Sequence, residues 1–205
     1  MQRELKMPWE KSFDEETAVK NAMRVFWEKG FEPASIADLL AGTGLNRGSF
    51  YNAFGGKQQL FVKALLKYDQ DRQAMLARLE ALDDPQKAIA TFFDDTVVNT
   101  VADRDHKGCF LFNTALQIKA HDEEVNAIVT NGVREIEAFF RRSIEVGQAR
   151  GEMPKELVPE ETAKALLALT VAIRLLGRGV FTEASLRTIA DEGKRMVGLT
   201  HAGSV

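Results

Sequence analysis

Arginine and lysine side chains gather in an acid-free stretch of the sequence, residues 42–67. The stretch contains Arg47, Lys57, Lys63 and Lys67 but neither aspartate nor glutamate, although acids outnumber bases 30 to 27 in the whole chain. Cationic side chains without neighbouring carboxylates are suited to binding nucleic acid, whose duplex carries one negative charge per roughly 1.7 Å. Because the net charge is -3, the chain as a whole has no attraction to nucleic acid, and any such binding must be local.

Residues that could carry enzyme chemistry form no such pattern. The sequence has no Ser/His/Asp order, phosphate-binding loop, dinucleotide glycine fingerprint or pair of metal ligands. His106, His121 and His201 do not fall at helical metal-ligand spacing, and the single cysteine, Cys109, adds little to a zinc hypothesis. We therefore expect no catalytic residue, no metal, no cofactor and no enzyme activity. The alternatives to a nucleic-acid-binding protein are a helical enzyme and a protein-interaction module, either of them with an aromatic pocket. Salt dependence would identify the interaction module, because its affinity for a DNA site would not fall steeply as salt increases.

The elements that must position the acid-free stretch are helices. Apolar residues recur at helical spacing, and the sequence shows neither period-two alternation nor an internal repeat. Residues 12–15 predict a capping box for a first helix that Gly30 ends, and a sixth helix is expected after Gly108. The other helix starts are predicted at Ser35, Asn46, Lys57, Asp84 with Pro85, Asp122, Pro159 and Thr182. The sequence therefore predicts an all-α fold of about nine helices.

Residues 35–52 predict two short helices that are joined by a glycine-bearing turn. Such a pair is a helix-turn-helix, whose second helix can enter the major groove of DNA. Phe50 and Phe54 would point into the core, while polar and basic side chains face outward. Gly48 would allow a close approach to the sugar-phosphate, and Lys57 would offer its charge beside the free N–H groups of a helix start. The predicted DNA-binding residues are Ser35, Asn46, Arg47, Gly48, Ser49, Tyr51, Asn52 and Lys57.

Residues 22–61, AMRVFWEKGFEPASIADLLAGTGLNRGSFYNAFGGKQQLF, closely resemble the N-terminal domain of the TetR family of bacterial transcriptional regulators. The features that carry the resemblance are Phe26, Gly30 with Phe31, Ser35 with Ile36, the run GLNRGSFY at 44–51, Phe54 and Lys57. The resemblance implies that Tyr51 and Lys57 contact phosphates, and that Arg47, Ser49 and Asn52 lie near bases or backbone. Asn52 with Ala53, and Gly55 with Gly56, depart from the usual residues and leave the operator sequence open.

The rest of the chain resembles the family more weakly. Residues 108–116 and 120–125 look like the sixth-helix segment of one TetR subgroup, some of whose members respond to electrophiles or oxidants. Residues 162–179 and 182–199 resemble the two helices that form the family's dimer interface. The resemblance implies a DNA-binding domain at 1–58 and a ligand-binding and dimerisation domain at 59–205.

The expected fifth to eighth helices carry aromatic and apolar residues with a few polar ones, as in a mostly apolar ligand pocket. The predicted ligand-binding residues are Phe92, Phe93, Thr96, Cys109, Phe110, Asn113, Thr114 and Gln117. Core packing is the more common role for any single phenylalanine. Cys109 is predicted in the first turn of its helix, where the dipole would favour a thiolate, with buried packing as the alternative. Arg174 interrupts an apolar helix, where an ion pair is more common than binding of an acidic ligand.

These observations predict a homodimeric, ligand-responsive transcriptional regulator. We expect a repressor that binds a palindromic operator in double-stranded DNA and is released by a small-molecule effector, either hydrophobic or electrophilic. The first residues, MQRELKMPWEKS, contain no apolar run, and the longest apolar run, residues 165–173, is shorter than the roughly 20 residues of a membrane span. A single cysteine suits a reducing compartment, so we expect a cytoplasmic protein without a membrane partner.

Overall fold

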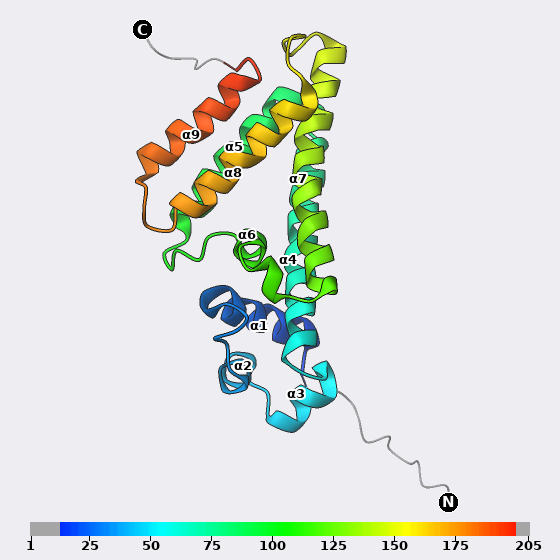
Figure 1. The fold of residues 1–205 in the computed structure, drawn as a ribbon, viewed down its shortest axis with the longest axis vertical. Helices are drawn as coiled ribbons and strands as arrows, with labels where there is room; N and C mark the ends of the chain where they lie inside the picture. Colours follow the sequence, from blue (N-terminus) through cyan, green and yellow to red (C-terminus); the bar gives the residue numbers. More distant parts are fainter. Residues whose placement is uncertain (1–12, 200–205) are drawn as a thin grey trace, which may run out of the picture. The chain divides into compact units, whose positions relative to one another are not determined.

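The computed structural model describes residues 13–199, and their regular elements are all helices (Figure 1). The helices are α1 (Glu15–Lys29), α2 (Ile36–Thr43), α3 (Arg47–Phe54), α4 (Lys57–Glu80), α5 (Pro85–Ala102), α6 (Phe110–Ala115), the short 3-10 helix η1 (Ile118–Ala120), α7 (Glu123–Arg150), α8 (Pro159–Leu176) and α9 (Glu183–Met196). The predicted all-α fold is confirmed. Over residues 13–199, none of the helices is long and apolar enough to cross a membrane.

The described residues form two compact units, and the boundary between them in the sequence lies between residues 67 and 68. The boundary lies within α4, so that helix contributes its first part to one unit and its second part to the other. The first unit holds α1, α2 and α3, and the second holds α5 to α9. The division at residue 58 that the resemblance implies stays a prediction.

Capping residues set most of the helix starts. The Ser35 hydroxyl accepts from the Asp38 N–H at 3.1 Å, and the Asp38 carboxylate accepts from the Ser35 N–H at 2.9 Å, which is a reciprocal capping box. Asp84 precedes Pro85 at the start of α5, and Thr182 caps α9. Part of the capping box predicted at residues 12–15 lies outside the described residues, and the N-cap of α1 is Asp14.

Phenylalanine rings fill the core of the first unit. Phe61 of α4 contacts Phe26 and Phe31, with ring centroids 5.0 and 4.8 Å apart. Phe50 and Phe54 of α3 are buried, and their ring centroids are 5.9 Å apart. These rings fix α3 through its inner face, which leaves the opposite face available to a ligand.

A cluster of four phenylalanines forms the core of the second unit. Phe92 and Phe93 of α5 pack against Phe139 and Phe140 of α7, with the Phe92 and Phe140 centroids 4.8 Å apart. Gly193 of α9 faces this cluster, and a Cβ atom there would lie only 2.5 Å from the Phe93 ring. The missing side chain is therefore what allows α9 to approach α5 so closely.

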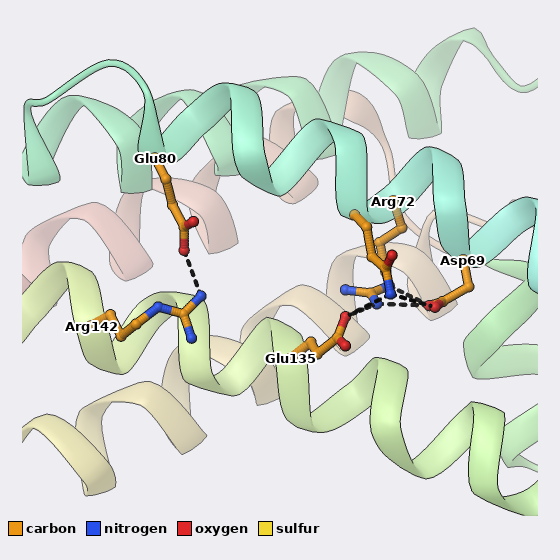
Figure 2. A network of polar contacts seen from close by, with 6 residues as sticks. Asp69, Arg72, Glu80, Glu135 and Arg142 are labelled. Atoms are coloured by element: carbon orange, nitrogen blue, oxygen red, sulfur yellow. Dashed lines mark hydrogen bonds and ion pairs between the residues drawn. The ribbon is translucent and has the colours of Figure 1, made fainter.

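Ion pairs join the second part of α4 to α7 (Figure 2). The Arg72 guanidinium, which is 8% exposed, donates to the Asp69 carboxylate at 2.7 Å and to the Glu135 carboxylate of α7. Two turns further along α4, Glu80 accepts from Arg142 of α7. Because a buried arginine is costly unless it is paired, these carboxylates hold Arg72 in place and fix the register between the two helices.

Candidate DNA-binding surface and ligand cavity

The helix-turn-helix predicted at residues 35–52 is present as α2, a short turn and α3. Gly44 in the turn has a φ of 71°, a left-handed conformation that favours glycine. Asn46 caps α3, because its side-chain oxygen accepts from the Ser49 N–H at 2.8 Å. Both features depend on neighbouring residues alone, and they set where α2 ends and where α3 begins.

The outer face of α3 presents polar and basic side chains. Arg47, Gly48 and Asn52 are exposed, and Tyr51 is 42% exposed. The Arg47 side chain forms neither a hydrogen bond nor an ion pair within residues 13–199. Ser49 is half-buried. This face carries no carboxylate, so a phosphate backbone could approach it without repulsion.

Lys57 begins α4 and is held by the segment between α1 and α2. Its Nζ donates to the Glu32 carbonyl at 3.0 Å and lies 4.6 Å from the centre of the Phe31 ring. A lysine ammonium has three N–H donors, so the Glu32 contact leaves donors for a phosphate. The ammonium is thereby positioned before any DNA is bound.

The acid-free stretch is less uniformly available than its sequence predicts. Lys63 of α4 forms an ion pair at 3.1 Å with Glu15 of α1. Similarly, Lys29 of α1 pairs with Asp38 of α2. Asp38 gains a hydrogen bond from Lys29 and others from Ser35, and these contacts hold its pKa below the ordinary value of 3.8. Within the stretch itself, Lys63 is therefore partly neutralised by Glu15, an acid that is distant in the sequence.

The two exposed N-cap residues, Ser35 and Asn46, stabilise helix starts and are also predicted to contact DNA. Ser35 and Asn46 are both exposed and both cap a helix. Both residues lie at helix starts, where unpaired backbone N–H groups favour binding of a phosphate. Their contact with DNA stays a prediction.

A cavity of about 230 Å³ lies among α6, α7 and α8. Its lining is mainly apolar, and the polar groups on it are Cys109, Asn113 and Arg174. The apolar lining residues are Phe112, Ala115, Leu116, Val133, Val171 and Leu175. A second hollow of about 270 Å³, between the end of α4 and α7, is lined by several charged residues that include Glu80, Arg142 and Arg150. The first cavity fits the predicted composition of a ligand pocket better.

Two of the predicted ligand-binding residues, Cys109 and Asn113, line this cavity. Phe92 and Phe93 lie in the phenylalanine cluster instead. The Thr96 and Thr114 hydroxyls donate to carbonyls of their own helices, those of Phe92 and Phe110, at 2.7 and 2.8 Å. Phe110 contacts Tyr68 edge to face, and Gln117 is exposed. None of these six residues lines the cavity.

Cys109 is the N-cap of α6 rather than part of its first turn, and its side chain is 7% exposed. Its Sγ lies 3.2 Å from the Tyr68 Oη. Lys107, two residues before Cys109, pairs with Asp103 at 3.0 Å and with Asp105 at 2.6 Å. These contacts raise the pKa of Lys107, the Asp105 bond most strongly, and the two carboxylates compensate its charge.

Arg174 of α8 is the charged residue of the cavity lining, and the set predicted from the sequence does not include it. It is half-buried, and its Nη1 donates to the Thr100 hydroxyl at 3.3 Å. The available signal was an arginine inside an otherwise apolar helix. Within residues 13–199, no three His, Cys, Asp or Glu side chains gather as a metal site would require.

Two family models match the chain. Residues 18–64 match the bacterial regulatory proteins of the tetR family, and residues 85–187 match the tetracyclin repressor-like C-terminal domain. The HTH-type transcriptional regulator YezE of Bacillus subtilis is 31% identical over 71% of this chain and 76% of YezE. The HTH-type transcriptional repressor ComR of Escherichia coli K12 is 29% identical over 91% of this chain and 90% of ComR.

Solved structures share the fold. A cysteine variant of the TetR family transcriptional regulator CifR, complexed with 26-bp double-strand operator DNA, is 26% identical with a TM-score of 0.78. The alignment covers 90% of this chain and 97% of that of CifR. A TetR transcriptional regulator from Chloroflexus aurantiacus, 23% identical over 89% of this chain and 92% of its own, has a TM-score of 0.80.

Proposed function

The chain belongs to the tetR family of bacterial regulatory proteins, and from this premise we propose that it is a dimeric repressor which a small effector releases from a palindromic operator. Members of this family are DNA-binding transcriptional regulators, and the chain is a regulator of this kind rather than an enzyme. Such a role in transcription would place the protein in the cytoplasm.

The observation that carries the proposal is the outer face of α3. Arg47, Tyr51 and Asn52 are exposed there, while Phe50 and Phe54 anchor the opposite face. We assign Tyr51 and Lys57 to phosphate contacts, which position the protein on any DNA. We assign Arg47 and Asn52 to base edges in the major groove, which select the sequence.

A homodimer would bring two such helices to one duplex. The outer side of α8 carries Ala168 and Leu175, both exposed, and the turn after α8 exposes Val180 and Phe181. These exposed apolar residues support an interface with a second copy of the chain. Two-fold symmetry would then place the two α3 helices about one DNA turn apart, which requires a palindromic operator.

The cavity among α6, α7 and α8 is our candidate for the effector site. It presents Cys109 together with apolar residues, so it could accept a hydrophobic effector or hold an electrophile against the thiol. The effector would act by binding the DNA-free form more tightly than the DNA-bound form, which is the condition for allosteric release.

Selection of bound sites from random double-stranded DNA tests this function. We expect enrichment of a single palindrome, with affinity that falls steeply as salt increases. The control is a variant with alanine at Arg47, Tyr51 and Asn52, which should enrich nothing. Enrichment of a non-palindromic sequence by a monomer would contradict the dimer, and an absence of enrichment by the wild type would contradict operator binding.

A further inference from the structure

The guanidinium of Arg174 lacks a counter-ion within residues 13–199. It is half-buried on a mainly apolar cavity wall, and its hydrogen bond goes to the neutral Thr100 hydroxyl. An arginine stays protonated at any physiological pH. Removing such a charge from water is unfavourable unless an anion compensates it. Arg174 is therefore suited to bind the anionic group of a ligand.

The acids near the start of α6 are already engaged. Asp103 pairs with Lys107 at 3.0 Å and accepts from the Gly108 N–H at 3.0 Å. Asp105 also pairs with Lys107, at 2.6 Å. Burial raises the pKa of Asp103, but the hydrogen bonds from Lys107 and from the Gly108 N–H outweigh burial. The pKa of Asp103 therefore lies below its ordinary value, and Lys107 lowers it most. Neither carboxylate is left over to neutralise Arg174.

The other polar groups of the cavity have partners too. The Asn113 amide donates to the Lys107 carbonyl at 2.6 Å, and its oxygen accepts from Arg178 at 3.5 Å. The Cys109 thiol contacts Tyr68. Arg174 is consequently the polar group of the cavity with the most unused hydrogen-bonding capacity, since a guanidinium has five N–H donors.

The size of the cavity limits the ligand. An apolar cavity of about 150 Å³ can hold benzene, so the 230 Å³ here leaves room for one ring or a short chain together with a small polar group. A planar carboxylate matches the paired N–H groups of a guanidinium, whereas the apolar wall disfavours a ligand with further charges.

We propose that this cavity binds a small monocarboxylate with an apolar body, such as an aromatic acid or a short-chain fatty acid, and that Arg174 binds the carboxylate. The assignment deepens the proposed function, since it rests on the cavity being the effector site. The apolar body lies against Phe112, Val133 and Val171, and the carboxylate replaces the water around the guanidinium.

Calorimetric titration of the full-length wild-type protein, without DNA, tests the assignment. Benzoate and hexanoate serve as probes, and benzamide and hexanamide serve as uncharged controls of nearly the same shape. We expect at least one acid to bind, and its amide to bind at least about tenfold more weakly, as is typical when a charge-assisted hydrogen bond is lost.

Variants then locate the carboxylate. Arg174→Gln should weaken binding of the acid at least about tenfold while leaving amide binding unchanged, and Arg174→Lys should retain part of the affinity. Arg141→Gln is the matched control, because Arg141 is exposed on α7 and does not line the cavity. Equal affinities of acid and amide for the wild type would overturn the assignment, as would acid binding that Arg174→Gln leaves intact or an absence of binding by both acids.

Two further measurements separate this inference from the proposed function. If Arg174→Gln lowers the dimer fraction in light scattering, Arg174 forms an ion pair between subunits and the assignment is overturned. If acid binding depends on Arg174 but leaves operator affinity unchanged, the ligand assignment stands and release by this effector fails. If other compounds release the operator while neither acid binds, the repressor function stands and the ligand assignment fails.

Discussion

The Oη of Tyr68 lies 3.2 Å from the Sγ of Cys109. Tyr68 is half-buried and Cys109 is buried. Loss of solvent around the phenol, followed by the influence of Cys109, raises the pKa of Tyr68 well above its ordinary value of 10.0. The phenol therefore keeps its proton at neutral pH, and this O–H can donate to the sulfur if the thiol ionises.

Cys109→Ser tests whether this thiol senses electrophiles. We expect the variant to bind operator DNA as the wild type does, but to stay bound when a quinone is added, because alkylation of the thiol adds bulk beside the cavity. Fluorescence anisotropy of labelled operator DNA measures the release. Equal release from both proteins would leave Cys109 with a packing role only.

Tyr68→Phe examines the same site without removing the sulfur. Loss of the O–H donor should slow alkylation of Cys109 by iodoacetamide, because the thiolate loses a stabilising hydrogen bond. Mass spectrometry of timed samples gives the rate, and denatured protein provides the control for intrinsic reactivity. An unchanged rate in the folded variant would show that the phenol does not influence the thiol.

Lys57→Ala and Arg47→Ala should have different effects on DNA binding. Loss of the Lys57 charge should weaken binding to all sequences similarly and reduce the slope of log affinity against log salt by about one unit. Loss of Arg47 should cost roughly 1 to 3 kcal/mol and relax the sequence preference at one operator position. Lys63→Ala is the control, because Lys63 already pairs with Glu15. Equal losses for Arg47→Ala on specific and scrambled DNA would refute its assignment to a base.

Ala168→Glu should prevent dimerisation. Ala168 is exposed on α8 and lies outside the cavity lining, so a carboxylate there would remain solvated in the monomer but would be buried in an interface. We expect a monomer in light scattering and much weaker operator binding. Ala127→Glu, at an exposed position of α7, should leave the dimer intact. A dimeric Ala168→Glu protein with normal operator affinity would place the interface elsewhere.

Asp38→Asn should reduce stability near neutral pH and leave it nearly unchanged in acid. The pKa of Asp38 is lowered chiefly by Lys29 and then by Ser35. A lowered folded-state pKa contributes stability that is present above the unfolded value of about 3.9 and is lost as the pH falls through the folded value. The difference in Tm between wild type and variant should therefore be largest at pH 6 to 7, which is roughly two units or more above the unfolded-state pKa of aspartate. The difference should shrink as the pH falls towards the folded-state pKa of Asp38. A difference that does not vary with pH would show that the ion pair contributes nothing.

The local features of the fold could be predicted from the sequence. Asn46, Asp84 and Thr182 mark helix starts because a cap satisfies N–H groups only two or three residues away. Phe50 and Phe54 lie four residues apart, which places them on one face of a helix. The close family resemblance covers residues 22–61, which include Asn46, Phe50 and Phe54.

Contacts between distant residues could not be predicted in this way. Glu15 and Lys63 lie 48 residues apart in the sequence, so only the packing of α1 against α4 reveals that this lysine is paired. Phe92 and Phe93 satisfy the composition of a pocket as well as that of a core. Phe92 and Phe93 belong to the core because they pack against Phe139 and Phe140 of the facing helix. These rings fill the space that a ligand would need.

The division of the chain at residue 67 separates its fluorophores. Among the described residues, Trp27 and Tyr51 belong to the first unit, and Tyr68 belongs to the second. Emission from Trp27 therefore follows the unit that carries α3, whereas far-ultraviolet circular dichroism is dominated by the longer helices of the second unit. Unfolding curves from the two signals would coincide if the units melt as one cooperative system and separate if they do not.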